Sequence, residues 1–191
     1  MLILSSNSPR RQELLRGVNI PFKVFVIDNI DESYPDDLPT EEIAEYIAVK
    51  KAAPYAEHLK GSDNTVLTAD TVVVCDGKVM GKPTDEADAC RMLRFLSGKT
   101  HQVYTGVCLT STEQQRHFSV KTDVTFRQLT DEEIEYYVST YKPLDKAGAY
   151  GIQEWIGYIG ITGINGSYYN VMGLPVQRIY QELRKKNESK E

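Results

Sequence analysis

The chain has 191 residues, of which 41% are hydrophobic and 26% are charged; these values fit a single domain over residues 1–191 with a buried core. Its formal net charge of −5 argues against a nucleic-acid-binding protein, which needs a broad basic surface. No run approaches the about 20 apolar residues that cross a bilayer, and no secretory signal is recognised, so we expect a cytoplasmic protein that does not bind membranes.

The first part of the chain is predicted to contain two short strands, a helix and an acidic loop. Residues 2–5 and 22–27 have the apolar character of strands. Between them, Ser8 is a suitable N-cap and Pro9 suits the first helical position, while Gly17 fits the C′ position after the helix. The acids and prolines of residues 28–39 indicate a loop.

The middle of the chain predicts two helices that flank a long strand and a hairpin. Thr40 is predicted to cap a helix that Pro54 ends or kinks. Residues 65–75 are a near-continuous apolar run, typical of a buried central strand. Asp76 and Gly77 then indicate a tight turn into residues 78–81, and a helix follows over about residues 84–97.

The remaining elements complete a mixed sheet. Residues 102–109 and 120–126 are predicted to pair as strands, and the second alternates between apolar and polar positions. Thr130 and Glu133 form a capping box ahead of a further helix, and Pro175 opens the last one. We therefore predict an α/β fold with a mixed, partly antiparallel central sheet and flanking helices.

The segment from Ser6 to Arg11 is the first candidate binding site. A strand that leads directly into a helix N-terminus presents unpaired N–H groups and the positive end of the helix dipole, which together bind anions. Arg10 and Arg11 stand in the first helical turn, where the dipole disfavours cations. This placement suggests a bound anion; the alternative is a solvated first turn with a good cap.

Asp70 is the second candidate, because it interrupts the apolar run of the central strand. A buried aspartate costs several kcal/mol (~3–5) unless it is paired or holds a cation. It is therefore either an ion-paired core residue, or a Mg²⁺ ligand or general base beside the predicted phosphate site. Asp31 or Glu32, in the acidic loop, could supply a second carboxylate, although such a loop taken alone is usually just solvated. The cysteines and histidines show no metal-binding spacing, so the thiols are expected to be free.

Three lysines add to a possible cluster of cations. Lys82 lies in a constrained Gly-Lys-Pro turn, and Lys51 follows a helical stretch. Lys146 opens a glycine-rich segment, which covers residues 145–173. Each alone is most often a surface residue. Together with the two arginines they would form the local cationic clamp that a triphosphate requires on a protein of negative net charge.

Five motifs stand in one order along the chain: Ser6-x-Ser8-Pro9-Arg10-Arg11, Ala69-Asp70-Thr71, Gly81-Lys82-Pro83, residues 146–153 (KAGAYGIQ) and residues 165–175 (NGSYYNVMGLP). Together these motifs give the chain a resemblance to the Maf family of nucleotide pyrophosphatases. They cover nearly the whole chain, and residues 148–153 resemble the branch of the family that acts on dTTP and UTP. The resemblance implies an α/β fold related to the inosine triphosphate pyrophosphatases, two lobes around a cleft, and a homodimer.

The resemblance also implies a role for each candidate residue. Asp70 is implied as the catalytic acid/base residue, with Lys82 and Arg11 beside it. The specificity positions are Arg10, Thr71 and Gln153. The remaining implied substrate-binding residues are Ser6, Ser8, Lys51 and Lys146, and Glu32 and Asp70 are the implied metal ligands.

The implied reaction is metal-assisted hydrolysis of a nucleoside triphosphate to the monophosphate and pyrophosphate. Mg²⁺ or Mn²⁺ would neutralise charge on the phosphates. Asp70 would accept a proton from the attacking water or bind the metal, and the sequence leaves both roles open. Gln153 follows a glycine-containing loop, and its amide can pair with N3–H and O4 of uracil or thymine. The alternative function is a nucleotide-binding sensor or division inhibitor without significant turnover.

Overall fold

The computed structural model describes residues 1–188, and its core is one seven-stranded sheet. The sheet order is β2-β1-β3-β5-β6-β7, and β4 pairs with β3 beside this path. The pairs that β1 makes with β2 and β3 are parallel, whereas the other pairs are antiparallel. The strands are β1 (Leu2–Leu4), β2 (Phe22–Val24), β3 (Thr65–Cys75), β4 (Lys78–Met80), β5 (Thr100–Thr110), β6 (Gln115–Phe126) and β7 (Ile161–Asn165).

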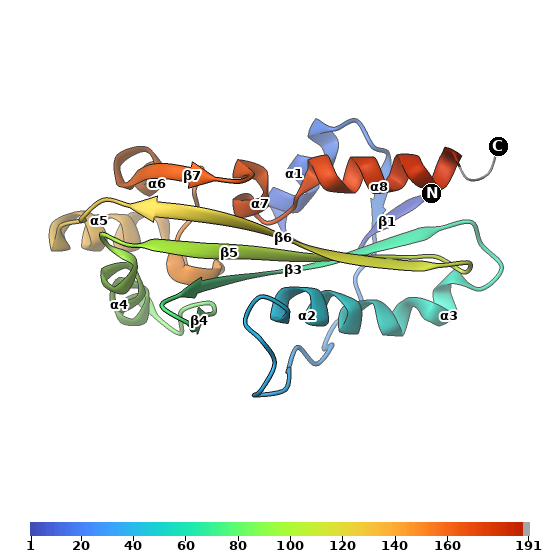
Figure 1. The fold of residues 1–191 in the computed structure, drawn as a ribbon, viewed down its shortest axis with the longest axis horizontal. Helices are drawn as coiled ribbons and strands as arrows, with labels where there is room; N and C mark the ends of the chain where they lie inside the picture. The colour runs from blue at the N-terminus through green and yellow to red at the C-terminus, as the bar shows by residue number, and fades with distance from the viewer. Residues whose placement is uncertain (189–191) are drawn as a thin grey trace.

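Helices cover both faces of this sheet, which confirms the predicted mixed α/β fold. In Figure 1, α2 and α3 lie below the long strands, α1, α7 and α8 lie above them, and α4 and α5 lie at one end. The α-helices are α1 (Pro9–Gly17), α2 (Ile43–Ala52), α3 (Ala56–Leu59), α4 (Glu86–Leu96), α5 (Asp131–Tyr141), α6 (Trp155–Gly160), α7 (Tyr168–Met172) and α8 (Val176–Glu188). Two 3₁₀ helices, η1 (Ala53–Tyr55) and η2 (Ala147–Ala149), join them.

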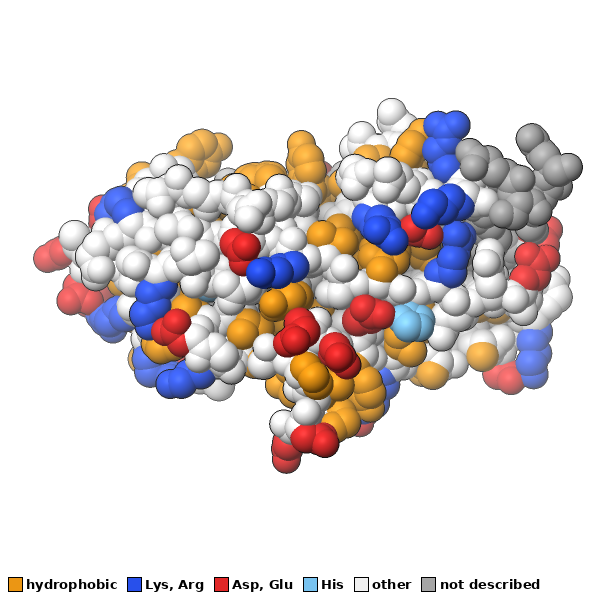
Figure 2. Space-filling view, in the orientation of Figure 1, with side chains coloured by type: hydrophobic (Ala, Val, Ile, Leu, Met, Phe, Trp, Pro, Cys, Tyr) orange, Lys and Arg blue, Asp and Glu red, His pale blue; other side chains and the backbone are white. Residues whose placement is uncertain are grey.

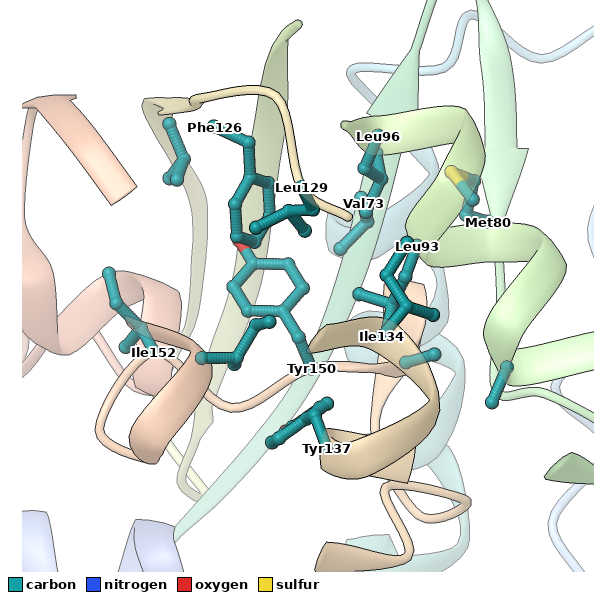
Figure 3. Packing of buried hydrophobic residues seen from close by; sticks show 14 of the residues in the cluster. Val73, Met80, Leu93, Leu96, Phe126, Leu129, Ile134, Tyr137, Tyr150 and Ile152 are labelled. Atoms are coloured by element: carbon teal, nitrogen blue, oxygen red, sulfur yellow. The ribbon is translucent and has the colours of Figure 1, made fainter. Parts of the chain in front are cut away.

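Two large apolar clusters divide the molecule into lobes. One lies between α4, α5 and the far ends of the long strands, and Figure 3 shows Tyr150 pointing there toward Phe126 and Leu129. The other packs α1 and α8 against β1 and the near ends of β3 and β5. Because β3 and β5 contribute residues to both clusters, the lobes share one sheet.

Several local predictions are confirmed. Ser8 caps α1, and the turn at Asp76 and Gly77 has the two positive φ angles, 50° and 72°, of a type I′ hairpin. Thr130 and Glu133 form the predicted capping box of α5. Helix α2 ends at Ala52, just before the proline that was expected to end it.

Other local predictions are wrong. Gly17 is the last residue of α1, and the left-handed conformation belongs to Asn19, with a φ of 55°. Thr40 makes no cap: α2 begins at Ile43 after Glu42, which makes no side-chain capping bond. Strand β6 begins five residues before the predicted start, at Gln115, because pairing with β5 extends through its polar half.

Within residues 1–188, no helix is long and apolar enough to cross a membrane.

Candidate active site

An interruption in the sheet edge opens a cleft. Strand β1 pairs with β3 as far as Leu67, and β4 begins to pair with β3 at Val73. Within the described chain, residues 68–72 of β3 therefore have no neighbouring strand on that side. A cleft of about 840 Å³ opens there, bordered by the start of α1, the acidic loop, the turn after β4 and the glycine-rich segment.

The structure brings every residue predicted for the site to this cleft. They are Ser6, Ser8, Arg10, Arg11, Glu32, Lys51, Asp70, Thr71, Lys82, Lys146 and Gln153. In β3, Asp70 and Thr71 are the two partly exposed residues of an otherwise buried strand. Their exposure follows directly from the missing neighbour strand.

Helix α1 directs its N-terminus toward the cleft. The Ser8 hydroxyl accepts a hydrogen bond from the Arg11 N–H at 3.4 Å, and the Ser6 hydroxyl accepts one from the Ser8 N–H at 3.2 Å. Pro9 needs no acceptor because it lacks an N–H. The segment between β1 and α1 is thereby held in a tight loop whose residues line the cleft.

Arg11 is fixed by three acceptors in different parts of the chain. Its Nε donates to the Gly173 carbonyl at 2.8 Å, and its two terminal nitrogens donate to the Ala69 carbonyl at 2.9 Å and the Thr71 hydroxyl at 3.2 Å. Burial lowers the pKa of Arg11 and the neighbouring Arg10 adds to this, while Asp70 and Glu32 oppose it. The guanidinium remains charged. It has five N–H groups, so two of them stay available to a ligand.

Lys51 joins the two acidic residues of the predicted metal site. Its ammonium lies 2.7 Å from Asp70 Oδ1 and 2.9 Å from Glu32 Oε1. The Lys51 and Asp70 side chains are only 16% and 15% exposed, whereas Glu32 is 56% exposed. Lys51 thus occupies the point on which both carboxylates converge.

This donor set decides how a metal can bind. Residues 1–188 contain no group of three or more histidine, cysteine or acidic side chains placed to hold a metal. The chain therefore provides no complete metal cage. Mg²⁺ commonly takes one or two carboxylates and completes its shell with substrate phosphates and water. Asp70 and Glu32 fit such a substrate-dependent site.

A chain of polar contacts crosses the glycine-rich side of the cleft. Arg10 donates to Asp145 at 3.0 Å, and Lys146 lies 2.9 Å from Asp145 and 3.2 Å from Glu154. Glu154 in turn accepts a hydrogen bond from the Tyr137 hydroxyl. That hydroxyl also accepts from the Gly151 N–H at 3.0 Å. The contacts link a predicted specificity residue on α1 to the segment that carries Gln153.

Three residues of this network were not predicted from the sequence: Asp145, Glu154 and Tyr137. Burial opposes ionisation of Asp145, but hydrogen bonds from Lys146 and Arg10 outweigh it and lower its pKa. Burial and the contact with Glu154 raise the pKa of Tyr137, which keeps it a hydrogen-bond donor. Their position in the sequence could have indicated the two acids, because Asp145 directly precedes Lys146 and Glu154 directly follows Gln153.

Gln153 reaches the cleft through a closely packed turn. A Cβ on Gly151 would lie 3.2 Å from Gln153 Nε2 and 3.0 Å from both Lys146 Cε and Glu154 Cδ, so this approach favours glycine. The Gln153 Oε1 atom is buried and has no hydrogen-bond partner in the part of the chain that the structure describes. A buried acceptor of this kind is normally satisfied, so the Gln153 side chain would gain a hydrogen bond if its amide turned toward a donor in the cleft.

The cleft has less free positive charge than the sequence suggested. Five cationic and four acidic side chains line it, and Arg10, Lys51 and Lys146 each form an ion pair with one of those acids. Lys82 is exposed on the turn after β4 and has no ion-pair partner within residues 1–188. A polyanion would therefore meet Lys82 and Arg11 directly and share the other cations with acidic neighbours.

The geometry agrees with the comparisons with known proteins. A family model described as "Maf-like protein" matches residues 1–186. The chain belongs to the Maf family. Proteins named dTTP/UTP pyrophosphatase in Phocaeicola vulgatus and Porphyromonas gingivalis are 61% and 52% identical to it, over 96% and 98% of this chain and 95% of each relative. The residues that resemble the Maf motifs thus lie together in one cleft of a chain from that family.

A solved structure shows a more distant likeness to this Maf chain. It is a Mycobacterium abscessus protein titled nucleoside-triphosphatase / dITP/XTP pyrophosphatase, with a TM-score of 0.42 and 12% identity over 98% of this chain and 96% of that one. At this level the likeness carries no argument about activity.

Proposed function

We propose that this Maf family chain hydrolyses dTTP and UTP to the nucleoside monophosphate and pyrophosphate. The observation that carries the proposal is Asp70, a carboxylate on an open strand edge that faces a cleft with cationic side chains around it. The names of relatives that are 52–61% identical support the same substrates. A protein that only bound a polyanion would gain nothing from a carboxylate beside the phosphates unless a metal lay between them.

The phosphate-binding groups divide between a fixed and a mobile cation. Arg11 is held by three hydrogen bonds and presents its remaining N–H groups to the phosphates. Lys82 is exposed and free to follow the leaving pyrophosphate. The N-terminal N–H groups of α1 add partial positive charge near Ser6 and Ser8. Placed in advance, these donors stabilise the charge that develops on the leaving group.

We assign the hydrolytic step to Asp70 and its neighbours. Lys51 holds the Asp70 carboxylate in place, and this carboxylate takes a proton from water that attacks the α-phosphorus, or else ligates the metal. Glu32 and Asp70 would hold Mg²⁺ or Mn²⁺ together with the substrate phosphates. When bound, the cation neutralises negative charge on those phosphates.

Base recognition is assigned to Gln153. Its unpartnered Oε1 would accept a hydrogen bond from the N3–H of uracil or thymine, and its amide nitrogen would donate to O4. Cytosine reverses both partners at this edge, since its N3 accepts and its C4 amino group donates. We therefore expect dTTP and UTP to be used well ahead of dCTP and CTP, with little sensitivity to the 2′-hydroxyl.

Product analysis tests the proposal directly. The purified protein is incubated with Mg²⁺ or Mn²⁺ and a panel of nucleoside triphosphates, and the products are separated by chromatography. We expect monophosphate and pyrophosphate in equal amounts. Stoichiometric orthophosphate with nucleoside diphosphate would contradict the reaction, and tight binding without turnover would support a sensor or division inhibitor instead.

A nucleic-acid-binding role has little support on the face shown in Figure 2. Basic side chains gather there beside α8, but Arg116, Arg178 and Lys185 surround the carboxylate of Glu182 at 3.0–3.3 Å. Acidic and apolar side chains lie together on the loop before α2 on the same face. The mixed charge differs from the broad basic surface that a nucleic acid needs.

We also propose that the protein is a cytoplasmic homodimer. The family resemblance supports the dimer, and three free cysteines suit a reducing compartment. Light scattering after size-exclusion chromatography measures the mass of the assembly, for which we expect twice the 21.6 kDa of the chain.

A further inference from the structure

Thr105 lies behind the cleft and contacts it through one hydroxyl group. The residue is fully buried in β5, directly opposite Thr71 of β3, and does not line the cleft. Its Oγ1 lies 2.9 Å from Thr71 Oγ1 and donates to the Asn170 carbonyl at 3.1 Å. Thr105 therefore touches a proposed specificity residue without reaching the ligand itself.

Counting protons fixes the direction of this chain of hydroxyls. A threonine hydroxyl has one proton to donate and two lone pairs that accept. The Asn170 carbonyl can only accept, so the Thr105 proton is committed to it. The contact between the two threonines then forms only if Thr71 donates to Thr105. The two hydrogen bonds, from Thr105 to the Asn170 carbonyl and from Thr71 to Thr105, can form together only in this direction. The single hydroxyl proton of Thr71 is then used by Thr105.

We propose that Thr105 is a positioning residue that makes Thr71 an obligate hydrogen-bond acceptor in the cleft. One lone pair of Thr71 accepts from Arg11 at 3.2 Å, and the second is left for the ligand. At this point the cleft selects a substrate O–H or N–H and disfavours a carbonyl or phosphate oxygen. Arg11 contributes to the same polarity, because a cation that donates to the hydroxyl oxygen favours donation of its proton away toward Thr105.

The ligand donor is the 3′-hydroxyl of the sugar, an assignment that rests on the proposed function. The neutral donors shared by dTTP and UTP are the base N3–H and this hydroxyl, and Gln153 takes the first. Thr71 follows Asp70 by one residue, so their side chains leave opposite faces of β3, Asp70 toward Lys51 of α2 and Thr71 toward Arg11 of α1. Both border the open strand edge, and the sugar adjoins the α-phosphate that Asp70 serves, so a nucleotide that lies across this edge would bring its sugar to Thr71.

The substitution Thr105→Val removes the hydroxyl and keeps the shape of the side chain. Asn170 O keeps the Gly173 N–H, 3.0 Å away, as a partner, so the variant should fold. The Thr71 proton then loses its acceptor and turns toward the cleft, where it can donate to an acceptor at the 3′ position of the sugar. Thr105→Ser is the matched control, because it retains the hydroxyl and loses only a methyl group.

The test compares dTTP with its 3′-fluoro analogue, whose fluorine accepts weakly and has no proton to donate, for all three proteins. We expect the wild type and Thr105→Ser to prefer dTTP by about tenfold in kcat/KM, as one hydrogen bond allows, and Thr105→Val to lose the preference. Equal use of both nucleotides by the wild type would overturn the inference, as would an unchanged preference in Thr105→Val. A merely structural role for Thr105 would lower activity on both nucleotides alike.

Two further measurements keep the inference separate from the proposed function. If Thr105→Val does not fold, as judged by thermal denaturation, Thr71→Val should lose the same preference, and retention of it there would overturn the inference. If the wild type hydrolyses neither nucleotide, their dissociation constants are compared instead. A preference for dTTP in binding would then support the Thr71 assignment while the proposed hydrolysis failed.

Discussion

At the scale of single residues, Lys51 joins two of the acidic side chains of the cleft. It contacts Asp70 and Glu32 at once, although these two acids lie 38 positions apart in the sequence. The ammonium gives both carboxylates an oppositely charged neighbour, so the partly buried Asp70 is not left without an ion-pair partner. It also holds the place of a cation, so a metal that uses both acids must share them with Lys51 or displace it.

We expect Asp70→Asn to lower kcat by about a thousandfold, since an amide neither accepts a proton at neutral pH nor binds a divalent cation well. The fold should persist, because asparagine keeps an oxygen for Lys51, and the melting temperature should change little. Asp123→Asn is the matched control: Asp123 is also a partly buried strand residue paired with a lysine, at 3.1 Å, but it lies outside the cleft. Wild-type turnover by Asp70→Asn would exclude both roles of Asp70. Partial recovery in excess Mn²⁺ would identify it as a metal ligand.

The substitution Gln153→Glu should lower kcat/KM for dTTP and UTP by at least about a hundredfold. A carboxylate cannot donate to O4, and its charge would lie beside Glu154. Substrate competition among UTP, dTTP and CTP measures the effect, with Gln181→Glu on the exposed side of α8 as the control. A variant that keeps the wild-type order of substrates would show that another residue reads the base.

At the scale of elements, helix α5 supports the segment that carries Gln153. Tyr137 accepts from the Gly151 N–H and donates to Glu154, so a single hydroxyl joins the helix to both sides of Gln153. Figure 3 shows Tyr137 and Tyr150 within the same cluster of buried residues. The base-reading segment is thus anchored by packing as well as by hydrogen bonds.

Removing that hydroxyl with Tyr137→Phe leaves a buried N–H without its acceptor and should cost about 1–3 kcal/mol of unfolding free energy. We expect KM for dTTP to rise more than kcat falls, because Gln153 moves while Asp70 keeps its contacts on β3. Urea denaturation and steady-state kinetics measure the two effects. Tyr141→Phe, one turn further along the same helix and exposed to solvent, is the control. A fall in kcat at unchanged KM would contradict the assignment.

Local signals predicted much of the fold, because they depend on a few neighbouring residues. The Ser8 cap, the Asp76-Gly77 turn and the Thr130–Glu133 box each arise from backbone preferences that short segments already express. The errors occurred where tertiary pairing decided the outcome. The polar half of β6 forms a strand because β5 lies beside it, and α6, β7 and α7 form within a glycine-rich segment that has no clear periodicity.

The residues of the cleft were predicted more fully than the contacts between them. Residue types and the family motifs predicted eleven residues that line the cleft. The sequence could not predict the ion pair between Arg10 and Asp145, which lie 135 positions apart. Lys146 was expected as an open cation, whereas it is nearly buried between two acids. Such pairs depend on how loops approach one another in three dimensions, and no spacing rule encodes that approach.

At the scale of the whole molecule, three long strands bind the lobes together. Strands β3, β5 and β6 each span 11 or 12 residues, and β3 and β5 contribute to both large apolar clusters. Since neither lobe has a sheet of its own, we propose that residues 1–191 form one domain. We expect a single unfolding transition that coincides by circular dichroism and by Trp155 fluorescence. Two separated transitions would show that the lobes are independent.

His101 should make the stability of this domain depend on pH. The ring is fully buried, contacts the Tyr150 hydroxyl at 2.7 Å and stacks on Phe126, and burial lowers its pKa from 6.5 to about 4. Below about pH 6.5 the His101 ring is protonated in the unfolded chain, whereas in the folded chain it becomes protonated only near pH 4. The contribution of His101 is therefore present above pH 6.5 and falls by about 3 kcal/mol toward pH 4. Urea titrations at several pH values give the dependence of the unfolding free energy on pH. This dependence should be weaker between pH 6.5 and 4 in His101→Gln than in the wild type, and it should be unchanged in the control His58→Gln, whose histidine is exposed. An unchanged dependence in His101→Gln would exclude His101 as its source.

Because the sheet edge is interrupted, a main-chain N–H of β3 faces the cleft without a strand partner among the described residues and can report ligand binding. Successive N–H groups of a strand point to opposite sides, and the contacts of Leu67 and Ala69 place the odd-numbered residues of this part of β3 toward the opening. The Thr71 amide hydrogen therefore faces solvent in the middle of a sheet whose neighbouring amides are paired. It should exchange with deuterium faster than the amides of Asp70 and Val72 and become protected when a nucleotide fills the opening. Hydrogen exchange at the Thr71 amide would then report nucleotide binding even in variants that cannot hydrolyse the nucleotide. The gap in the sheet edge thus provides a way to measure binding separately from catalysis.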